Sequence, residues 1–143
     1  MEEQIINFYS ENDFTLEHQE AYSFWIKNVI ISEDRKMGEI SYIFCDDDYL
    51  LELNKEYLNH DTLTDIISFD YSVGKIVQGE IYISTERVKE NSVLYNVSFP
   101  EELRRVIIHG ILHLCGYKDK SHEETYLMRN MEEEKMKLFH VEQ

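Results

Sequence analysis

Two histidines, His109 and His113, lie four positions apart in the segment from Arg104 to Lys120. If this segment is helical, their side chains lie one turn apart on the same face. Imidazole nitrogens placed in this way can bind one metal ion, as they do in zinc hydrolases that carry a His pair at i and i+4. The spacing therefore indicates part of a metal site.

Gly116 and Asp119 extend the pattern, because glycine adopts the left-handed conformation that ends a helix and lets the chain turn back. The long metzincin motif uses the same offsets, but it carries a glutamate general base directly after the first histidine. Gly110 occupies that position here. We therefore expect His109, His113 and Asp119 to be the metal-ligating and catalytic residues of a site for one zinc ion, without the peptidase base.

Two alternatives stay open at this point. The first is that both histidines are core residues, because a pair at i and i+4 also arises by chance. The apolar residues around the pair would leave both rings half-buried without an obvious local partner, and this favours the metal. The second is that His122 is the third ligand. Ser121 and Glu124 form a capping box that puts His122 at the start of the next helix, so Asp119 is preferred.

The elements that must position these residues follow from the hydrophobic pattern. Strands are predicted at residues 5–9, 40–45, 65–70 and 79–83, with a hairpin connection at 73–75 and a loop at His60. Helices are predicted at 17–31, from the triplet Asp46–Asp48 to Tyr57, at 84–95, from Pro100 through the His pair, and after Ser121, where Leu127, Met131 and Leu138 would form the core stripe. The order β-α-β-α-β-β-α-α-α predicts an α/β or α+β fold, with a mixed sheet of about four strands and helices packed on it.

The chain has 143 residues, of which 43% are hydrophobic, and this predicts a single domain spanning residues 1–143. No apolar run approaches the length of a membrane span, and the start Met-Glu-Glu-Gln lacks the basic residues of a signal peptide. Cys45 and Cys115 form neither a zinc pattern nor a disulfide framework. We therefore expect a protein of the reducing cytoplasm.

The net charge of −15 disfavours a nucleic-acid partner, because phosphate contacts need Lys and Arg. The charges are unevenly spread, however, and four basic residues flank the His pair: Arg104, Arg105, Lys118 and Lys120. These residues are either a basic rim that binds phosphates, with Arg104 and Arg105 as weak candidates for substrate contacts, or ordinary surface charge. The acidic triplet Asp46–Asp48 is interpreted as the first turn of a helix rather than as a second metal site.

Four stretches make the chain resemble the YbeY family of bacterial metal-dependent endoribonucleases. They are Leu53-Asn54, Thr64-Asp65-Ile66-Ile67-Ser68-Phe69, Gly79-Glu80-Ile81-Tyr82-Ile83-Ser84 and His109-Gly110-Ile111-Leu112-His113-Leu114-Cys115-Gly116-Tyr117. The resemblance implies one zinc held by three side chains beside a cleft, and cleavage of single-stranded RNA in ribosomal RNA processing (16S maturation) and ribosome quality control. Ribosomal RNA and the ribosome would be the partners.

The sequence departs from the family pattern at two positions. The family's third ligand is a histidine at the offset held here by Asp119, and the family tends to have an RNA-contacting arginine where this chain has Leu58. Because Leu58 and the acidic charge weaken the case for catalysis, a zinc-stabilised module that binds the ribosome or a protein is the alternative function. Glu102, seven residues before His109, is either a partner of a ligand imidazole or a favourable charge in the first helical turn.

The aspartate ligand has a consequence for pH dependence. An anionic ligand in place of a neutral imidazole lowers the charge of the site by one unit, so water held there should be less acidic. We expect an activity optimum at higher pH than in the Asp119→His variant, checked by pH–rate profiles of both proteins. Equal optima would contradict the expectation.

Overall fold

The computed structural model describes residues 6–58 and 64–139, and its elements follow the predicted order. The strands are β1 (Ile6–Ser10), β2 (Lys36–Cys45), β3 (Ile66–Asp70) and β4 (Ile76–Ser84). The helices are α1 (Gln19–Ser32), α2 (Asp47–Leu58), α3 (Thr85–Leu94), α4 (Phe99–Leu114) and α5 (His122–Met136). The predicted fold class is confirmed, although β2 and β4 begin earlier than predicted. The predicted loop at His60 lies outside the described residues.

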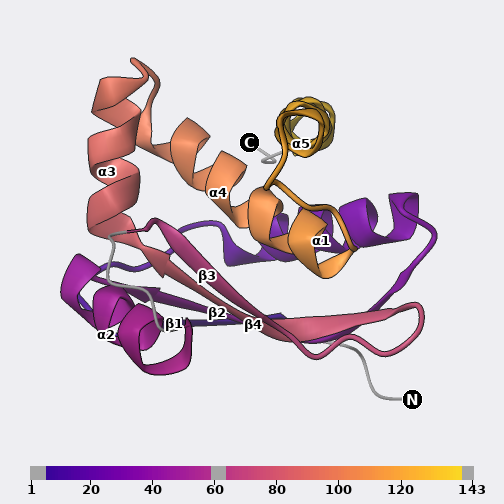
Figure 1. The fold of residues 1–143 in the computed structure, drawn as a ribbon, viewed down its shortest axis with the longest axis horizontal. Helices are drawn as coiled ribbons and strands as arrows, with labels where there is room; N and C mark the ends of the chain where they lie inside the picture. Colours follow the sequence, from indigo (N-terminus) through magenta and orange to yellow (C-terminus); the bar gives the residue numbers. More distant parts are fainter. Residues whose placement is uncertain (1–5, 59–63, 140–143) are drawn as a thin grey trace.

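The described strands form a mixed sheet in the order β1-β2-β4-β3 (Figure 1). β1, β2 and β4 are parallel neighbours, whereas β3 pairs antiparallel with β4 and lies at the edge. The predicted hairpin connection joins β3 to β4, and Gly74 adopts a φ of 59° in it. Because β3 pairs only with β4 in this sheet, its other edge is available to border a cavity.

Helices cover both faces of the sheet, with α2 on one side and α1 and α4 on the other (Figure 1). Successive β3 side chains point to opposite faces, so Ile67 packs with Leu50 of α2 while Ile66 packs against the main core on the α4 side. α2 begins at the acidic triplet, with Asp47 and Asp48 in its first turn, as predicted. Among the described residues, no helix has the length and apolarity needed to cross a membrane.

α4 is held tightly against the sheet. Its N-terminus is capped by Ser98, whose Oγ accepts a hydrogen bond from the Glu101 amide at 3.2 Å. The buried Tyr42 hydroxyl of β2 donates to the Ile107 carbonyl at 2.8 Å. Gly110 allows a close approach, because a Cβ there would lie 3.0 Å from side-chain atoms of both Ile66 and Ile81. Position 110 therefore faces the sheet and has no room for a glutamate.

α5 packs on α4 with a different face from the one predicted. Leu127 and Leu138 are 49% and 40% exposed, and Met131 is only partly buried, so the predicted core stripe is wrong. The buried face instead carries Met128 and two charged residues, Glu132 and Lys135. The charged pair can be buried because each side chain finds partners: Glu132 with Arg105 and His109, Lys135 with Ser32 and Glu33.

Candidate metal centre

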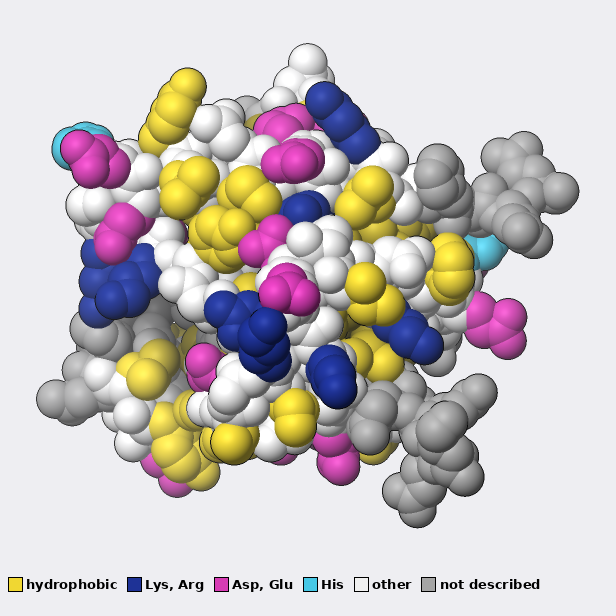
Figure 2. All heavy atoms as spheres, turned by 90° about the vertical axis from the view of Figure 1, so that its right-hand side faces the viewer, with side chains coloured by type: hydrophobic (Ala, Val, Ile, Leu, Met, Phe, Trp, Pro, Cys, Tyr) yellow, Lys and Arg dark blue, Asp and Glu magenta, His cyan; other side chains and the backbone are white. Residues whose placement is uncertain are grey.

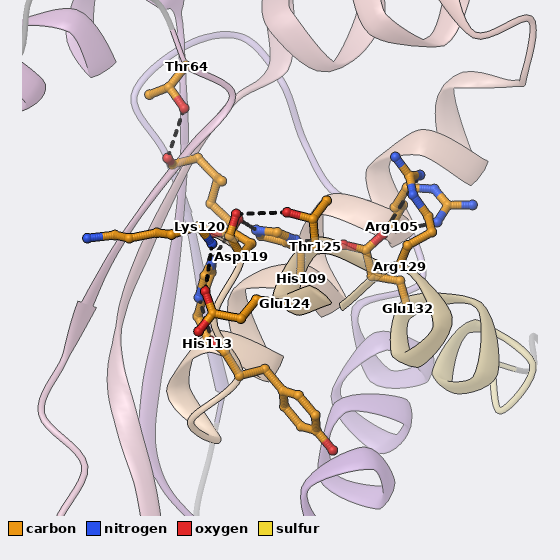
Figure 3. A network of polar contacts seen from close by, with 12 residues as sticks. Thr64, Arg105, His109, His113, Asp119, Lys120, Glu124, Thr125, Arg129 and Glu132 are labelled. Carbon is orange, nitrogen blue, oxygen red and sulfur yellow. Dashed lines mark hydrogen bonds and ion pairs between the residues drawn. The ribbon is translucent and has the colours of Figure 1, made fainter. Parts of the chain in front are cut away.

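The three predicted ligands converge on one point beside the C-terminal half of α4 (Figure 3). Asp119 Oδ2 lies 3.2 Å from His109 Nε2 and 3.4 Å from His113 Nε2. One ligand atom from each of the three residues fits within a 4.8 Å cluster, the one such group of acidic, His and Cys side chains found in the described parts of the chain. His122, the alternative third ligand, is exposed at the first position of α5 and is not part of the group.

The turn after α4 brings Asp119 to this point. Gly116 adopts a φ of 106°, and the amides of Gly116 and Tyr117 donate to the carbonyls of His113 (2.9 Å) and Leu112 (3.0 Å). This is the Schellman pattern that ends a helix at a glycine. At the other end, Ser121 forms the predicted capping box of α5. Asp119 therefore lies in a short connection whose two ends are both fixed by hydrogen bonds.

The other nitrogen of each imidazole is already engaged. His109 Nδ1 lies 2.6 Å from Glu132 Oε2, and His113 Nδ1 lies 2.9 Å from the Tyr117 carbonyl oxygen. Because a carboxylate and a carbonyl only accept, each Nδ1 is the donor in its contact, and in the neutral form of a ring the lone pair of Nε2 would point toward Asp119. Outer contacts of this kind fix the tautomer and orientation of histidines that bind metals.

The spacing of the donor atoms fits zinc. Ligand atoms about 2.0–2.1 Å from a tetrahedral zinc are about 3.3–3.4 Å apart. The separations of 3.2 and 3.4 Å between Asp119 Oδ2 and the two Nε2 atoms agree with this value. Two nitrogens and one oxygen leave the fourth position of a tetrahedral ion for water or substrate, as catalytic zinc sites require.

Glu132 is the functional residue that the sequence pattern did not reveal. Its buried carboxylate accepts a hydrogen bond from Arg105 Nη1 at 3.0 Å as well as contacting His109. Burial lowers the pKa of His109, but the hydrogen bond and charge of Glu132 and the charge of Asp119 outweigh it and raise the pKa above its ordinary value. Protons therefore compete with a metal for this ring, and metal uptake should weaken as the pH falls.

The ligands face a cavity of about 670 Å³ between β3, α3, α4 and α5. Arg105 lines this cavity, but its guanidinium is paired with Glu132 and Glu133. Arg104 does not line this cavity. Its guanidinium carbon instead lies 4.9 Å from the centre of the Phe139 ring. The structure thus brings only one of the two arginines to the cavity, and substrate binding by either residue stays a prediction.

Besides Asp70 at the end of β3, two carboxylates at helix and strand starts line the cavity, Asp65 before β3 and Glu102 in the first turn of α4. Burial raises the pKa of both groups above the ordinary range. The first-turn position of Glu102 is as predicted, but the partner of the ligand imidazole is Glu132 and not Glu102. Leu58 also lines the cavity, so the position where the family tends to have an arginine borders the site.

The fold and the site define an α/β domain in which two histidines of one helix and a following aspartate can hold a metal ion at the wall of an open cavity. The family model described as endoribonuclease YbeY matches residues 4–140. Proteins of that name are similar to the chain throughout: the one from Christiangramia forsetii is 60% identical over all of both chains, and the one from Flavobacterium johnsoniae is 58% identical over 97% of this chain and 100% of its own.

A solved structure agrees with this assignment. A solution structure of a Thermotoga maritima protein superimposes with a TM-score of 0.64 at 27% identity, covering 93% of this chain and 90% of its own. The chain therefore belongs to the YbeY family of endoribonucleases.

The geometry predicts which residues retain the metal. We expect one zinc per chain in the wild type after reconstitution at neutral pH, loss of that zinc in Asp119→Ala, and retention in His122→Ala, because only Asp119 is placed among the donor atoms. Elemental analysis of the three purified proteins checks this. Zinc retained by Asp119→Ala, or lost from His122→Ala, would contradict the geometry.

A second prediction concerns Tyr117, whose carbonyl orients His113. The Tyr117 hydroxyl donates to Glu33 Oε1 at 2.7 Å, and Glu33 is held by Lys135 at 3.0 Å. Removing the hydroxyl in Tyr117→Phe should loosen the turn and weaken zinc binding by roughly tenfold, at the lower end of the effect of outer contacts.

Competition with a chromophoric chelator measures this zinc affinity. The matched control is Tyr126→Phe, which removes the hydroxyl of a tyrosine that is 71% exposed on α5. An unchanged zinc affinity in Tyr117→Phe, with the thermal midpoint unchanged, would show that the Glu33 contact does not position the site.

Proposed function

We propose that this chain is a zinc-dependent endoribonuclease that cleaves single-stranded RNA, acts in ribosomal RNA processing, including 16S maturation, and contributes to ribosome quality control. The endoribonuclease activity follows from the family, whereas the zinc, the strand preference, the ribosomal role and a cytoplasmic location are our proposals. The observation that carries the proposal is the convergence of His109, His113 and Asp119 at the wall of an open cavity.

Each residue of the centre has a defined part in this proposal. His109, His113 and Asp119 would hold the zinc, and Glu132 and the Tyr117 carbonyl would keep the two imidazoles oriented. When bound, zinc supplies a Lewis acid for a phosphate oxygen and lowers the pKa of water in the fourth position. Because Gly110 replaces the peptidase glutamate and faces the sheet, position 110 cannot accept the proton of the attacking water or 2′-hydroxyl group. A carboxylate of the cavity wall could accept this proton instead. Asp65 and Glu102 are available there.

Lys120 is the best placed cation for a phosphate beside the metal. It follows the ligand Asp119 directly and lines the cavity, and no ion pair to its ammonium group occurs within residues 6–58 and 64–139. In Figure 3 its side chain extends away from Arg105 and Arg129, both of which lie beside Glu132. Arg105 is neutralised by Glu132 and Glu133, so Lys120 has the free charge that a phosphodiester needs.

The face drawn in Figure 2 offers RNA no broad basic surface. On the face drawn in Figure 2, Lys and Arg side chains form small groups among acidic and hydrophobic side chains, not a continuous basic stripe. With a net charge of −15, this pattern also favours the second candidate, a zinc-stabilised module that binds the ribosome or a protein partner with weak or no catalysis.

A cleavage assay separates the two functions. We expect the zinc-loaded wild type to cut a single-stranded RNA and to leave the same sequence intact in a duplex, and His113→Ala to cut neither. Gel analysis of end-labelled RNA provides the measurement. Absence of cleavage by the wild type at one zinc per chain would support the binding module instead.

The salt dependence of RNA binding tests the part of Lys120. Replacement by glutamine should weaken binding and lower the slope of log K against log salt by about one, because one phosphate contact is lost. Lys118→Gln is the matched control, since Lys118 is an exposed lysine of the same turn that does not line the cavity. Equal slopes in the wild type and Lys120→Gln would exclude the phosphate contact.

A further inference from the structure

We propose that Tyr95 forms a stacking site for one unpaired base of the RNA, at the end of the cavity remote from the metal centre. This inference rests on the proposed function and adds a subsite to it. Tyr95 lines the same cavity as His109 and His113, and it is 56% exposed. In the parts of the chain that the structure describes, no ring contact or side-chain hydrogen bond engages the tyrosine.

The position of Tyr95 relative to the metal follows from α4. Tyr95 lies just before Ser98, the N-cap of α4, whereas His113 is in the last turn of that helix. Between them the residues of α4 that line the cavity are Glu102, Arg105, Val106 and His109, all on one face. From Glu102 to His113 the helix rises about 16 Å. An extended RNA strand can cross this length with a few nucleotides, so the stacked base is not the one at the cleaved bond.

The backbone at Tyr95 is fixed before any ligand arrives. Tyr95 is the C-cap of α3, and Asn96 adopts a φ of 57° in the left-handed region. The amides of Asn96 and Val97 donate to the carbonyls of Val93 (3.2 Å) and Ser92 (2.9 Å). This Schellman turn and the N-cap of α4 hold Tyr95 at the cavity, with a side chain that is 56% exposed. A preorganised aromatic ring loses little conformational entropy on binding a flat partner.

The surroundings of Tyr95 favour a base over a protein side chain. Asn91 lies one turn earlier on α3, lines the same cavity, and can both donate and accept hydrogen bonds at a base edge. The neighbouring Val93 and Leu94 are more exposed than Tyr95 but do not line this cavity. A protein contact would use the apolar patch Val93–Leu94, whereas a base that continues from the metal centre would meet Tyr95 and Asn91. Stacking also requires an unpaired base, which agrees with cleavage of single strands.

The test combines protein variants with RNA that lacks one base. Each position of a single-stranded substrate is replaced in turn by an abasic nucleotide, and KM is measured with zinc-loaded protein. One position a few nucleotides from the cleaved bond should raise KM for the wild type by between about fivefold and about a hundredfold. Tyr95→Ala should show the same loss with intact RNA and no further loss at that abasic position, whereas Tyr95→Phe should behave as the wild type does.

Two controls make the outcomes decisive. Tyr126→Ala removes an exposed tyrosine of α5 outside the cavity, and Leu94→Ala removes the apolar neighbour on α3. Neither should change KM.

If the wild type cuts RNA but Tyr95→Ala keeps its KM and its full abasic profile, the stacking site is wrong and the proposed function stands. Equal losses of ribosome association in Leu94→Ala and Tyr95→Ala, with KM unchanged in both, would assign this end of α3 to a protein partner. If the wild type cuts no RNA, the proposed function fails, and the subsite with it.

Discussion

The contact between His109 Nδ1 and Glu132 Oε2 at 2.6 Å is the interaction on which the metal centre depends. It joins α4 to α5, and the side chains of both residues are largely buried. A buried carboxylate is unfavourable unless charged or hydrogen-bonding partners surround it. Glu132 meets this condition through Arg105 and His109, so one side chain helps to set the face that α5 turns inward and also orients the His109 imidazole. The charge of Arg105 balances that of Glu132, whereas no Lys or Arg pairs with the candidate ligand Asp119 within the described residues.

The order of the elements and the clustering of His109, His113 and Asp119 could be predicted because both follow from local patterns. The positions of His109, His113, Gly116 and Asp119 lie within one helix and the turn after it, where spacing translates directly into geometry. The buried face of α5 could not be predicted in this way. Leu127, Met131 and Leu138 form a plausible apolar stripe, but they lie partly or largely in solvent. The contacts that decide the orientation come from α1 and α4, at positions distant in the sequence.

The role of Glu132 likewise depends on contacts between elements that are distant in the sequence. Three consecutive glutamates, residues 132–134, look alike in the sequence, and an acidic run is usually solvated surface. Only the arrangement of α5 on α4 distinguishes these glutamates. Glu132 is buried against His109, whereas Glu133 is more exposed and pairs with Arg105. The partner of His113 is a backbone carbonyl, a group that every residue possesses. No residue type marks it, and only the Schellman turn after α4 places it.

The acidic character of the protein and an RNA substrate are compatible if recognition is local. At physiological ionic strength, charges more than about 8 Å apart are largely screened, so acids on distant faces repel a phosphate at the cavity only weakly. The nearby carboxylates matter more. Among them, Glu132 is compensated by Arg105, and Asp119 would be compensated by any divalent ion that it ligates. Asp65 and Glu102 line the same cavity, and burial raises the pKa of both carboxyl groups above the ordinary range. A protein with few free cations also binds RNA weakly at non-specific sites. In the proposed function, affinity would come from the metal, from the Lys120 ammonium group and from contacts to unpaired bases, all of them at the cavity.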